Sequence, residues 1–460
     1  MAKKPSIPKG TRDFNAEEVA KRSYIMETIK EHFKIFGFQP IETPSFENSE
    51  TLMGKYGDEG DRLIFKILNS GDYLGKISDD DYASKSEGVM TSKISEKALR
   101  YDLTVPFARY VVQHQNDIEF PFKRYQMQPV WRADRPQKGR FREFYQCDAD
   151  VVGSKSLFQE VEFIQLYDAV FSALKLVGAT IKINNRKILS GIAEVIGAQD
   201  KLIDFTVALD KLDKIGEEKV KDEMRSKGIK EDGITKLQPL FTLAGDFGNQ
   251  IESLKSILST SEIGLKGIEE LEFINTAISS LQLKTATLQL DVTLARGLNY
   301  YTGAIFEVAA PQGVKMGSIG GGGRYDDLTS IFGLPNVSGV GISFGLDRIY
   351  LVLEELNLFP DTITAATKVL FINFGDQETM ESLKAVTKLR QLGLQAELYP
   401  DAAVSGKQMK KQMNYANRRG IPFVVLVGEE ELKSNLFTLK NMSTGAQQKL
   451  SFNDLQAALN

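Results

Sequence analysis

The sequence is poor in residues that form cross-links or bind metal ions. Its 460 residues include one cysteine, Cys147, which excludes an intramolecular disulfide. Two histidines, His32 and His114, and this single cysteine are too few for a typical zinc site made of protein ligands. The longest hydrophobic runs, such as Val424–Val427, are far shorter than the roughly 20 residues of a membrane-spanning helix. We therefore expect no disulfide scaffold, no protein-held structural metal and no membrane association.

The sequence also lacks an excess of charge of either sign. Lys and Arg number 57 and Asp and Glu number 61, so the formal net charge is −4. This balance argues against a protein that coats nucleic acid over its whole surface, but it permits local basic patches. No apolar segment follows the first six residues, so we expect no secretory signal and a cytoplasmic protein. The length predicts about two to four domains.

Hydrophobic spacing divides the chain into parts of different character. Strand-like segments separated by hairpin-like gaps predict an α+β domain on a largely antiparallel sheet, which we place at residues 1–360. Within it, residues 187–280 are charged and helical, which predicts an inserted helical subdomain. The polar, turn-rich residues 69–97 predict a surface insertion. Strands and helices alternate over residues 367–460, which predicts a separate C-terminal α/β domain.

A basic segment, residues 123–146, is the first candidate for a binding site. From Lys123 to Glu143 it contains seven basic and two acidic residues, a local charge of +5. Two strand-like halves flank a turn, and on the second half Arg140, Arg142 and Phe144 would share one face. This arrangement suits a nucleotide, because guanidinium groups bind phosphates and an aromatic ring stacks on a base. A solvated charged hairpin is the alternative, and it is the more common outcome for a charge run taken alone.

Four further features of the sequence have both a functional and a purely structural interpretation. The tyrosine pair within residues 296–303 suits the wall of a ligand pocket, or two packed rings at a turn. The glycines of residues 320–323 suit close approach of backbone to a ligand, or a flexible turn. Arg348 falls in the first turn of a predicted helix, where a cation is disfavoured unless it faces an anion. The basic helix at 405–419 suits RNA phosphates, or a solvated face.

Taken together, these segments resemble class II aminoacyl-tRNA synthetases, and specifically the histidyl-tRNA synthetase family. The resemblance extends nearly end to end, from Gly10–Asp13 to the C-terminal domain. The three class-defining motifs are similar to GFQPIETPSFE at 37–47, VWRADRPQKGRFREF at 130–144 and VSGVGISFGLDRI at 337–349. The histidine-specific elements are similar to LRYDLT at 99–104, QCDAD at 146–150 and RGLNYYTG at 296–303.

The resemblance implies a fold and an activity. The fold is an antiparallel-sheet catalytic core with a C-terminal anticodon-binding domain, in a homodimer whose interface contains Pro44. The activity is that of a histidine–tRNA ligase: histidine and ATP, with Mg²⁺ bound to the ATP, give histidyl-adenylate and pyrophosphate. The histidyl group then moves to the 3′ end of tRNA(His).

The resemblance also implies roles for individual residues. Arg296 and Arg132 would be catalytic, because both would contact the α-phosphate where charge develops. The ATP-binding residues would be Arg132, Asp134, Arg140, Phe144 and Arg348. The histidine-binding residues would be Asp102, Leu103, Thr104, Gln146, Asp150, Arg296, Tyr300 and Tyr301. The candidates for contact with the tRNA acceptor end are Arg135, Gln137 and Lys138.

The sequence departs from the family pattern at three places. Asn299 stands where the family usually has aspartate, which removes a charge beside the tyrosine pair. Asp134 replaces the usual glutamate of the second motif and keeps the same acceptor chemistry. The insertion at 69–97 is longer than the family pattern leads us to expect.

Two proteins of other classes would share this resemblance. One is the regulatory subunit of a histidine-biosynthetic phosphoribosyltransferase, which binds histidine without charging tRNA and typically lacks both the C-terminal domain and the arginine at position 296. The other is a nucleic-acid-processing accessory protein, which would have lost the arginines that bind ATP. Arg132, Arg140, Arg296 and residues 367–460 are all present, and these features favour the enzyme.

Overall fold

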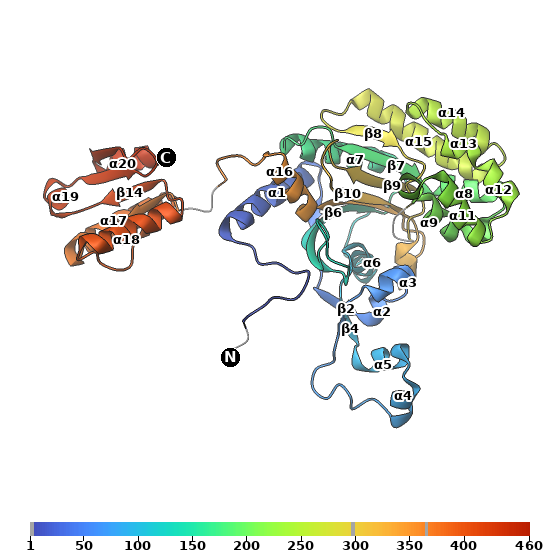
Figure 1. The fold of residues 1–460 in the computed structure, drawn as a ribbon, viewed down its shortest axis with the longest axis horizontal. Coiled ribbons are helices and arrows are strands. Elements are labelled where there is room, and N and C mark those ends of the chain that lie inside the picture. Colours follow the sequence, from blue (N-terminus) through green and yellow to red (C-terminus); the bar gives the residue numbers. More distant parts are fainter. Residues whose placement is uncertain (1–3, 296–299, 364–366) are drawn as a thin grey trace. The chain divides into compact units, whose positions relative to one another are not determined.

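Two separate units make up the chain in the computed structural model, which describes residues 4–295, 300–363 and 367–460 (Figure 1). The first unit is Met1–Pro360 and the second is Asp361–Asn460. Within the described ranges, no helix combines the length and the apolar character needed to cross a membrane.

An eight-stranded sheet forms the centre of the first unit. Its strands are, in spatial order, β1 (Gln39–Pro40), β5 (Phe122–Trp131), β6 (Glu143–Val152), β11 (Gly339–Gly345), β10 (Gly320–Tyr325), β9 (Ala304–Ala309), β7 (Thr180–Asn185) and β8 (Thr287–Leu290). The pairs β1–β5 and β7–β8 are parallel and the other pairs are antiparallel. Side chains alternate between the faces of β6, so Cys147, Ala149 and Val151 enter the hydrophobic core.

Helices α1 (Ala16–Ile35), α7 (Phe158–Ala173) and α16 (Leu346–Glu355) contribute to the main hydrophobic core on one side of this sheet. A capping box between Asn15 and Glu18 begins α1. Ile25, Ile29 and Phe33 follow at helical spacing and are fully buried. A smaller core includes residues of α6 (Thr104–Gln113), of β5 and of β10. The segment before α6 packs in this core, near the other face of the large sheet.

A three-stranded sheet and four short helices form an extension of the first unit. The strands are, in spatial order, β2 (Phe46–Asn48), β4 (Lys97–Leu99) and β3 (Lys66–Ile67). The helices are α2 (Ser49–Leu52), α3 (Gly57–Arg62), α4 (Asp79–Ser84) and α5 (Glu87–Ile94). The polar insertion at 69–97 contains α4 and α5, which project away from the large sheet (Figure 1).

Helices fill the segment between β7 and β8. They are α8 (Arg186–Val195), α9 (Leu202–Leu209), α10 (Leu212–Ile215), α11 (Glu217–Ser226), α12 (Glu231–Lys236), α13 (Gln238–Phe241), α14 (Phe247–Ile257) and α15 (Glu262–Leu281). Two glycines let α8 and α15 approach closely, because a Cβ on Gly191 would lie 2.6 Å from the Cα of Gly264.

The second unit is built on a mixed five-stranded sheet. Its strands are, in spatial order, β13 (Ala396–Leu398), β12 (Val369–Phe371), β14 (Phe423–Leu426), β15 (Phe437–Asn441) and β16 (Gln447–Leu450). Its helices are α17 (Asp376–Gln391), α18 (Gly406–Arg418), α19 (Glu429–Ser434) and α20 (Phe452–Leu459). Strand β12 pairs in parallel with both β13 and β14, as expected for strands joined by helices. The predicted fold class, α+β with a C-terminal α/β part, is confirmed.

The structure excludes one of the open alternatives and overturns one local prediction. The glycines at 320–323 do not form a flexible turn but lie in β10, paired on both sides. Arg140 and Arg142 do not share a strand face with Phe144, because β6 begins at Glu143. The backbone N–H of Arg142 donates to the carbonyl of Gly10 at 2.8 Å, so the N-terminal segment interrupts the hairpin there.

A buried ion pair ties β10 to α7. Glu160 accepts hydrogen bonds of 2.6 Å from both Nε and Nη2 of Arg324, and the two side chains are 0% and 5% exposed. Burial raises the pKa of Glu160, and the paired guanidinium opposes that shift. Removing one partner of such a pair leaves the other charge buried and uncompensated.

We therefore expect Glu160→Gln to lower the free energy of unfolding by about 3–5 kcal/mol. Glu231→Gln is the matched control, because Glu231 forms the same two-bond pair with Arg225 on the exposed surface. Urea titration followed by fluorescence of Trp131, the single tryptophan, reports on the first unit alone. Equal and small losses in both variants would contradict this account.

Candidate active site

The candidate site lies on one face of the large sheet, over a floor made largely of glycine. Gln146, Asp148 and Asp150 of β6 point to this face, since the alternate residues enter the core. Across the sheet they pair with Gly345, Ser343 and Gly341 of β11. A Cβ at position 341 would lie 1.9 Å from Oδ1 of Asp150, so only glycine leaves room for that carboxylate. Two adjoining cavities open over this floor.

We call the first cavity the arginine cleft. Its volume is about 330 Å³, and the residues around it include Arg132, Asp134, Gly139, Arg140, Phe141, Phe144, Gln146, Tyr301, Glu307, Gly321, Ser343 and Arg348. All five residues predicted to bind ATP are among them. They come from the hairpin loop, the start of β6 and the first turn of α16. The segments far apart in the sequence that were predicted to share a site therefore do so.

Backbone carbonyls, rather than carboxylates, position two of the three arginines. Arg348 donates from Nε to the carbonyl of Gly139 at 2.8 Å and from Nη1 to that of Ser318 at 2.6 Å. Arg132 donates from Nε to the carbonyl of Tyr101 at 3.0 Å, and its guanidinium lies over the Tyr101 ring. A carbonyl fixes the direction of a guanidinium without neutralising it, so both groups keep their positive charge for an anion.

Electrostatics in the cleft also favour an anion. Burial lowers the pKa of Arg348, and the positive charges of Arg140 and Arg132 lower it further. Arg140 lies 3.8 Å from Asp134, at the outer limit of an ion pair. A phosphate would relieve the repulsion between the three guanidinium groups. Phe144 supplies an aromatic ring 5.2 Å from the guanidinium of Arg132.

The residues predicted to contact tRNA lie on the exposed loop of this hairpin. Arg135, Gln137 and Lys138 are exposed and line neither cavity. Gln137 and Arg140 exchange two backbone hydrogen bonds around a tight turn, and Gly139 has φ +71° there. A Cβ on Gly139 would also lie 3.3 Å from Cγ of Arg348, so glycine at the turn lets this arginine pack beneath it.

We call the second cavity the carboxylate pocket. Its volume is about 50 Å³, and the residues around it include Asp102, Thr104, Arg132, Gln146, Asp148, Asp150, Tyr300, Tyr301, Gly321, Tyr325, Gly341 and Ser343. It shares Arg132, Gln146, Tyr301, Gly321 and Ser343 with the arginine cleft, so the two cavities adjoin. Three carboxyl groups dominate its polar lining.

Asp102 is held before the start of α6 by three hydrogen-bond donors. It accepts hydrogen bonds from the hydroxyls of Tyr56 at 2.8 Å and Tyr300 at 3.2 Å, and from the backbone N–H of Val105 at 3.1 Å. Burial raises the pKa of Asp102, and these hydrogen bonds oppose the shift. Tyr300 meets Tyr301 edge to face at 5.0 Å between ring centroids, which forms an aromatic wall.

Asp150 forms an ion pair at the far end of the pocket. Its Oδ2 lies 2.7 Å from Nη2 of Arg124, and its Oδ1 accepts a hydrogen bond of 2.6 Å from the hydroxyl of Tyr325. Arg124 is fully buried, with its guanidinium 4.1 Å from the centre of the Phe107 ring. Burial raises the pKa of Asp150, and the charge of Arg124 opposes the shift.

The sequence-predicted residues divide into those the structure brings together and those it does not. Asp102, Thr104, Gln146, Asp150, Tyr300 and Tyr301 line the carboxylate pocket. Leu103 is fully buried and lines neither cavity; its carbonyl accepts a hydrogen bond from Arg124. Arg296 and Asn299 lie outside the described residues.

Sequence reasoning missed Asp148, Tyr325 and Ser343 in the lining of the pocket, and Arg124, which pairs with Asp150. Only the pairing of β5, β6, β10 and β11 brings them to one place, so no local pattern identified them. Alternation along β6 was the one available signal, because it places Asp148 on the same face as Gln146 and Asp150. Within the described residues, no cluster of three or more His, Cys, Asp or Glu is arranged to hold a metal ion.

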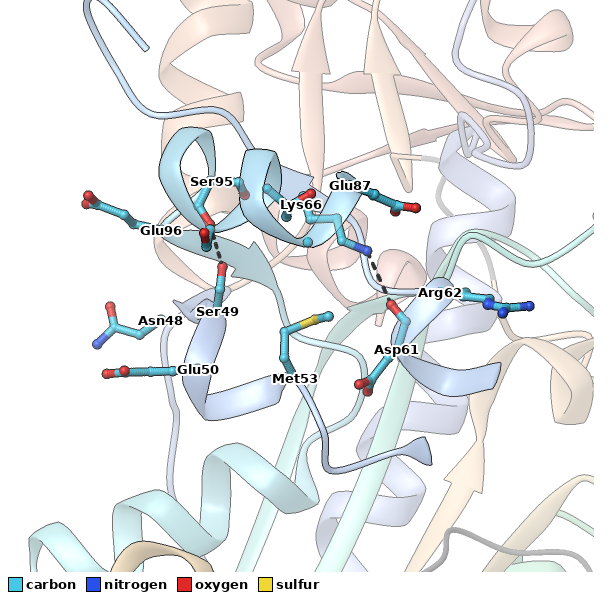
Figure 2. A pocket seen from close by; sticks show the side chains of 13 residues that line it. Asn48, Ser49, Glu50, Met53, Asp61, Arg62, Lys66, Glu87, Ser95 and Glu96 are labelled. Atoms are coloured by element: carbon cyan, nitrogen blue, oxygen red, sulfur yellow. Dashed lines mark hydrogen bonds between the residues drawn. The ribbon is translucent and has the colours of Figure 1, made fainter. Parts of the chain in front are cut away.

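A larger hollow, of about 930 Å³, lies in the extension beside α2, α3 and α5. None of the sequence-predicted site residues lines it. Figure 2 shows the Ser49 hydroxyl donating to the carbonyl of Ser95 and the Lys66 ammonium donating to that of Asp61. Its acidic residues Glu50, Asp61, Glu87 and Glu96 are not gathered around a buried cation, and we assign it no role.

Comparisons with known proteins agree over the whole chain. Residues 91–349 match the family described as histidyl-tRNA synthetase, and residues 368–460 match the family described as anticodon binding domain. A histidine–tRNA ligase of Christiangramia forsetii is 72% identical over 459 residues, which cover 100% of both chains.

Solved structures show the same likeness. The histidyl-tRNA synthetase from Nostoc sp. PCC 7120 gives a TM-score of 0.81 at 31% identity, with 100% of this chain and 99% of that chain covered. A structure from Bacillus halodurans, described as an ATP phosphoribosyltransferase regulatory subunit/histidyl-tRNA synthetase, gives a TM-score of 0.70 at 21% identity. That match covers 89% of this chain and 97% of that chain, and it shows likeness of fold alone.

The carboxylate pocket carries a cost in stability that can be measured. Burial raises the pKa of Asp148 from the ordinary 3.8 to about 7, which means that the folded protein disfavours the ionised form. The resulting loss in the free energy of unfolding is absent below pH 4, grows between pH 4 and pH 7, and reaches its full size above that range. The shift corresponds to on the order of 4 kcal/mol.

We therefore expect Asp148→Asn to stabilise the ligand-free protein, by an amount that rises from pH 4 to pH 7 and then stays constant. Thermal or urea unfolding, followed by Trp131 fluorescence at several pH values, measures this gain. Asp80→Asn, at an exposed carboxylate of α4, is the control and should show no such rise. A loss of stability in Asp148→Asn at pH 8 would show that the carboxylate has a structural role instead.

Proposed function

The chain belongs to the histidyl-tRNA synthetase family and is a histidine–tRNA ligase, and from this premise we propose a role for each cavity. ATP occupies the arginine cleft and histidine occupies the carboxylate pocket. The observation that carries this assignment is that an anion site and a cation site adjoin and share Arg132, Gln146 and Ser343. The substrates therefore meet at the shared lining, with the histidine carboxylate facing the α-phosphate.

The first reaction needs no nucleophile from the protein. A carboxylate oxygen of histidine forms a bond to the α-phosphorus, and the bond from that phosphorus to the bridging oxygen of the β-phosphate breaks. Histidyl-adenylate and pyrophosphate are the products. Catalysis then consists of holding the two substrates in line and stabilising the charge that develops on the phosphate oxygens.

On the ATP side, Arg132 binds the α-phosphate and Arg140 binds the γ-phosphate end. Phe144 stacks on the adenine, and Arg348 holds the nucleotide from the opposite side of the cleft. Support comes from the position of all four at one cavity and from the un-neutralised charge of Arg132 and Arg348. Arg296 completes the set as a contact to the α-phosphate and the histidine carboxylate, by its place in the family motif.

Magnesium enters with ATP as part of the substrate. Asp134 and Glu307 line the arginine cleft and provide carboxylate oxygens, the ligand type that Mg²⁺ prefers. Bound Mg²⁺ adds positive charge at the phosphates. The two carboxylates would hold it in place, directly or through its water ligands.

On the histidine side, Asp102, Thr104, Gln146 and Asp150 bind the amino group, and Tyr300 and Tyr301 lie beside the imidazole. The fixed hydroxyls and carboxylates of the pocket select by hydrogen bonding, which discriminates strongly because an analogue leaves buried polar groups unpaired. Support comes from the small volume of the pocket and from its three carboxyl groups. Leu103 contributes through its backbone, between Asp102 and Thr104.

In the second reaction, a ribose hydroxyl at the 3′ end of tRNA(His) attacks the carbonyl carbon of the adenylate, and AMP leaves. The exposed residues Arg135, Gln137 and Lys138 guide the acceptor end toward the cleft.

Residues 1–360 are the catalytic domain, with the 187–280 insertion, and residues 367–460 bind the anticodon. The basic side of α18 suits RNA phosphates in that role. We also place the enzyme in the cytoplasm, where tRNA, ATP and histidine meet.

We expect the enzyme to be a homodimer. Strand β2 is an edge strand of the three-stranded sheet, and Phe46 on it and Leu68 nearby are 48% and 53% exposed. An exposed edge with apolar side chains favours pairing with a second copy. Sedimentation at micromolar concentration measures the mass, and a monomer near 51.3 kDa would contradict the pairing.

Pyrophosphate exchange with ATP and Mg²⁺ tests the central assignment. We expect exchange with histidine and with none of the other nineteen standard amino acids. Exchange with a different amino acid would overturn the assignment of the carboxylate pocket. Histidine binding without exchange would indicate a regulatory histidine-binding protein in place of a ligase.

A further inference from the structure

Two of the three carboxyl groups of the carboxylate pocket already have a hydrogen-bond donor or a cation beside each oxygen. Asp102 accepts from Tyr56 and Val105 at Oδ1 and from Tyr300 at Oδ2. Asp150 accepts from Tyr325 at Oδ1 and faces Arg124 at Oδ2. These two groups organise the protein around the pocket, and each has limited capacity left for a ligand.

Asp148 is different, because it forms no ion pair within the described residues and one of its oxygens is buried without a hydrogen-bond partner. Oδ2 of Asp150 also lacks a hydrogen-bond partner, but the guanidinium of Arg124 lies beside it. The residue is 2% exposed, and its Oδ1 has no hydrogen-bond partner among the described residues. Across the sheet it pairs with Gln126 on one side and Ser343 on the other, and neither carries a positive charge. A buried polar atom of this kind is costly and calls for an explanation.

The charges around Asp148 show what is missing. Burial is the main cause of its raised pKa, and Asp150 and Asp102 raise it further. Arg124 of β5 and the Ser343 hydroxyl of β11 act in the opposite direction without cancelling the effect. The pocket around Asp148 therefore contains more negative than positive charge, and it favours a ligand that brings a cation.

The position of Asp148 along β6 indicates which part of the substrate it meets. Gln146 and Ser343 belong to both cavities, whereas Asp150 belongs to the carboxylate pocket alone. Residues two apart on a strand are separated by about 7 Å, so Gln146 and Asp150 are about 13 Å apart. The proposed function places the histidine amino group between the side chains of Gln146 and Asp150, and Asp148 lies between these two residues on the same face of β6.

We propose that Asp148 binds the amino acid, by accepting a charge-assisted hydrogen bond from the α-ammonium group of histidine. The inference rests on the proposed assignment of this pocket to histidine. It adds a contact outside the motif residues Asp102, Thr104, Gln146 and Asp150. Because the ammonium group is unchanged when the adenylate forms, the contact stabilises substrate and transition state alike. Its loss therefore raises KM for histidine and leaves kcat within a few-fold of the wild type.

Three ligands that differ in one group each provide the test. Histidine has the ammonium, the carboxylate and the ring; histidinol lacks the carboxylate; imidazolepropionate lacks the ammonium. Titration calorimetry or inhibition of pyrophosphate exchange gives the affinity of the wild type and of Asp148→Asn for each ligand. Asp80→Asn is the matched control at an exposed carboxylate.

We expect Asp148→Asn to weaken histidine and histidinol by about ten- to a hundredfold, the range of a hydrogen bond to a charged group. Binding of imidazolepropionate should change less than threefold, which also shows that the pocket of the variant is folded. KM for ATP should be unchanged. Equal weakening of all three ligands, or no weakening of any, would overturn the proposal.

The control reactions separate this inference from the proposed function. Histidine-dependent exchange by the wild type, with normal histidine affinity in Asp148→Asn, would overturn only the role of Asp148. Absence of histidine-dependent exchange in the wild type would overturn the assignment of the pocket itself.

Discussion

The register between β6 and β11 is the constraint on which the site depends. It sets Gln146, Asp148 and Asp150 opposite Gly345, Ser343 and Gly341, and so joins segments that are far apart in the chain. A shift of one residue would turn the three polar side chains into the hydrophobic core and bring Cys147, Ala149 and Val151 into the cavity. The glycine at 341 is part of the same constraint, because any side chain there would occupy the space of the Asp150 carboxylate. Strand pairing and pocket chemistry are thus specified by the same residues.

Much of the fold was predictable because it depends on local patterns. Alternating apolar residues identified the strands, helical spacing identified α1 and the helical run before β8, and the strand–helix alternation identified the second unit. The prediction failed at β10, because four consecutive glycines carry no alternation and glycine is common in turns. It also failed at Arg140 and Arg142, where a hydrogen bond to Gly10 ends the strand. That contact joins residues more than a hundred positions apart, so no local pattern contains it.

The residues of the site were predictable only where a single segment of the sequence contained a recognisable motif. Motif resemblance named the five predicted ATP-binding residues that line the arginine cleft and six predicted histidine-binding residues that line the carboxylate pocket. It did not find Arg124 and Tyr325, whose importance comes from contact with Asp150. Nor did it indicate that Asp102 accepts three hydrogen bonds while Asp148, in the described structure, has neither an ion pair nor a hydrogen-bond partner for Oδ1. Which carboxylate is available to a ligand depends on its partners, and partners follow from tertiary structure.

The way Arg132 and Arg348 are held has a consequence for how this sequence can diverge. Their direct hydrogen-bond partners are the main-chain carbonyls of Tyr101, Gly139 and Ser318, which every residue type possesses. Substitution of a neighbouring side chain leaves such an acceptor in place, whereas a carboxylate partner is lost by a single codon change. Substitutions of the surrounding side chains therefore leave the hydrogen bonds that orient the two guanidinium groups in place. Gly139 is the exception, because its positive φ strains any other residue and a Cβ there would lie 3.3 Å from Cγ of Arg348.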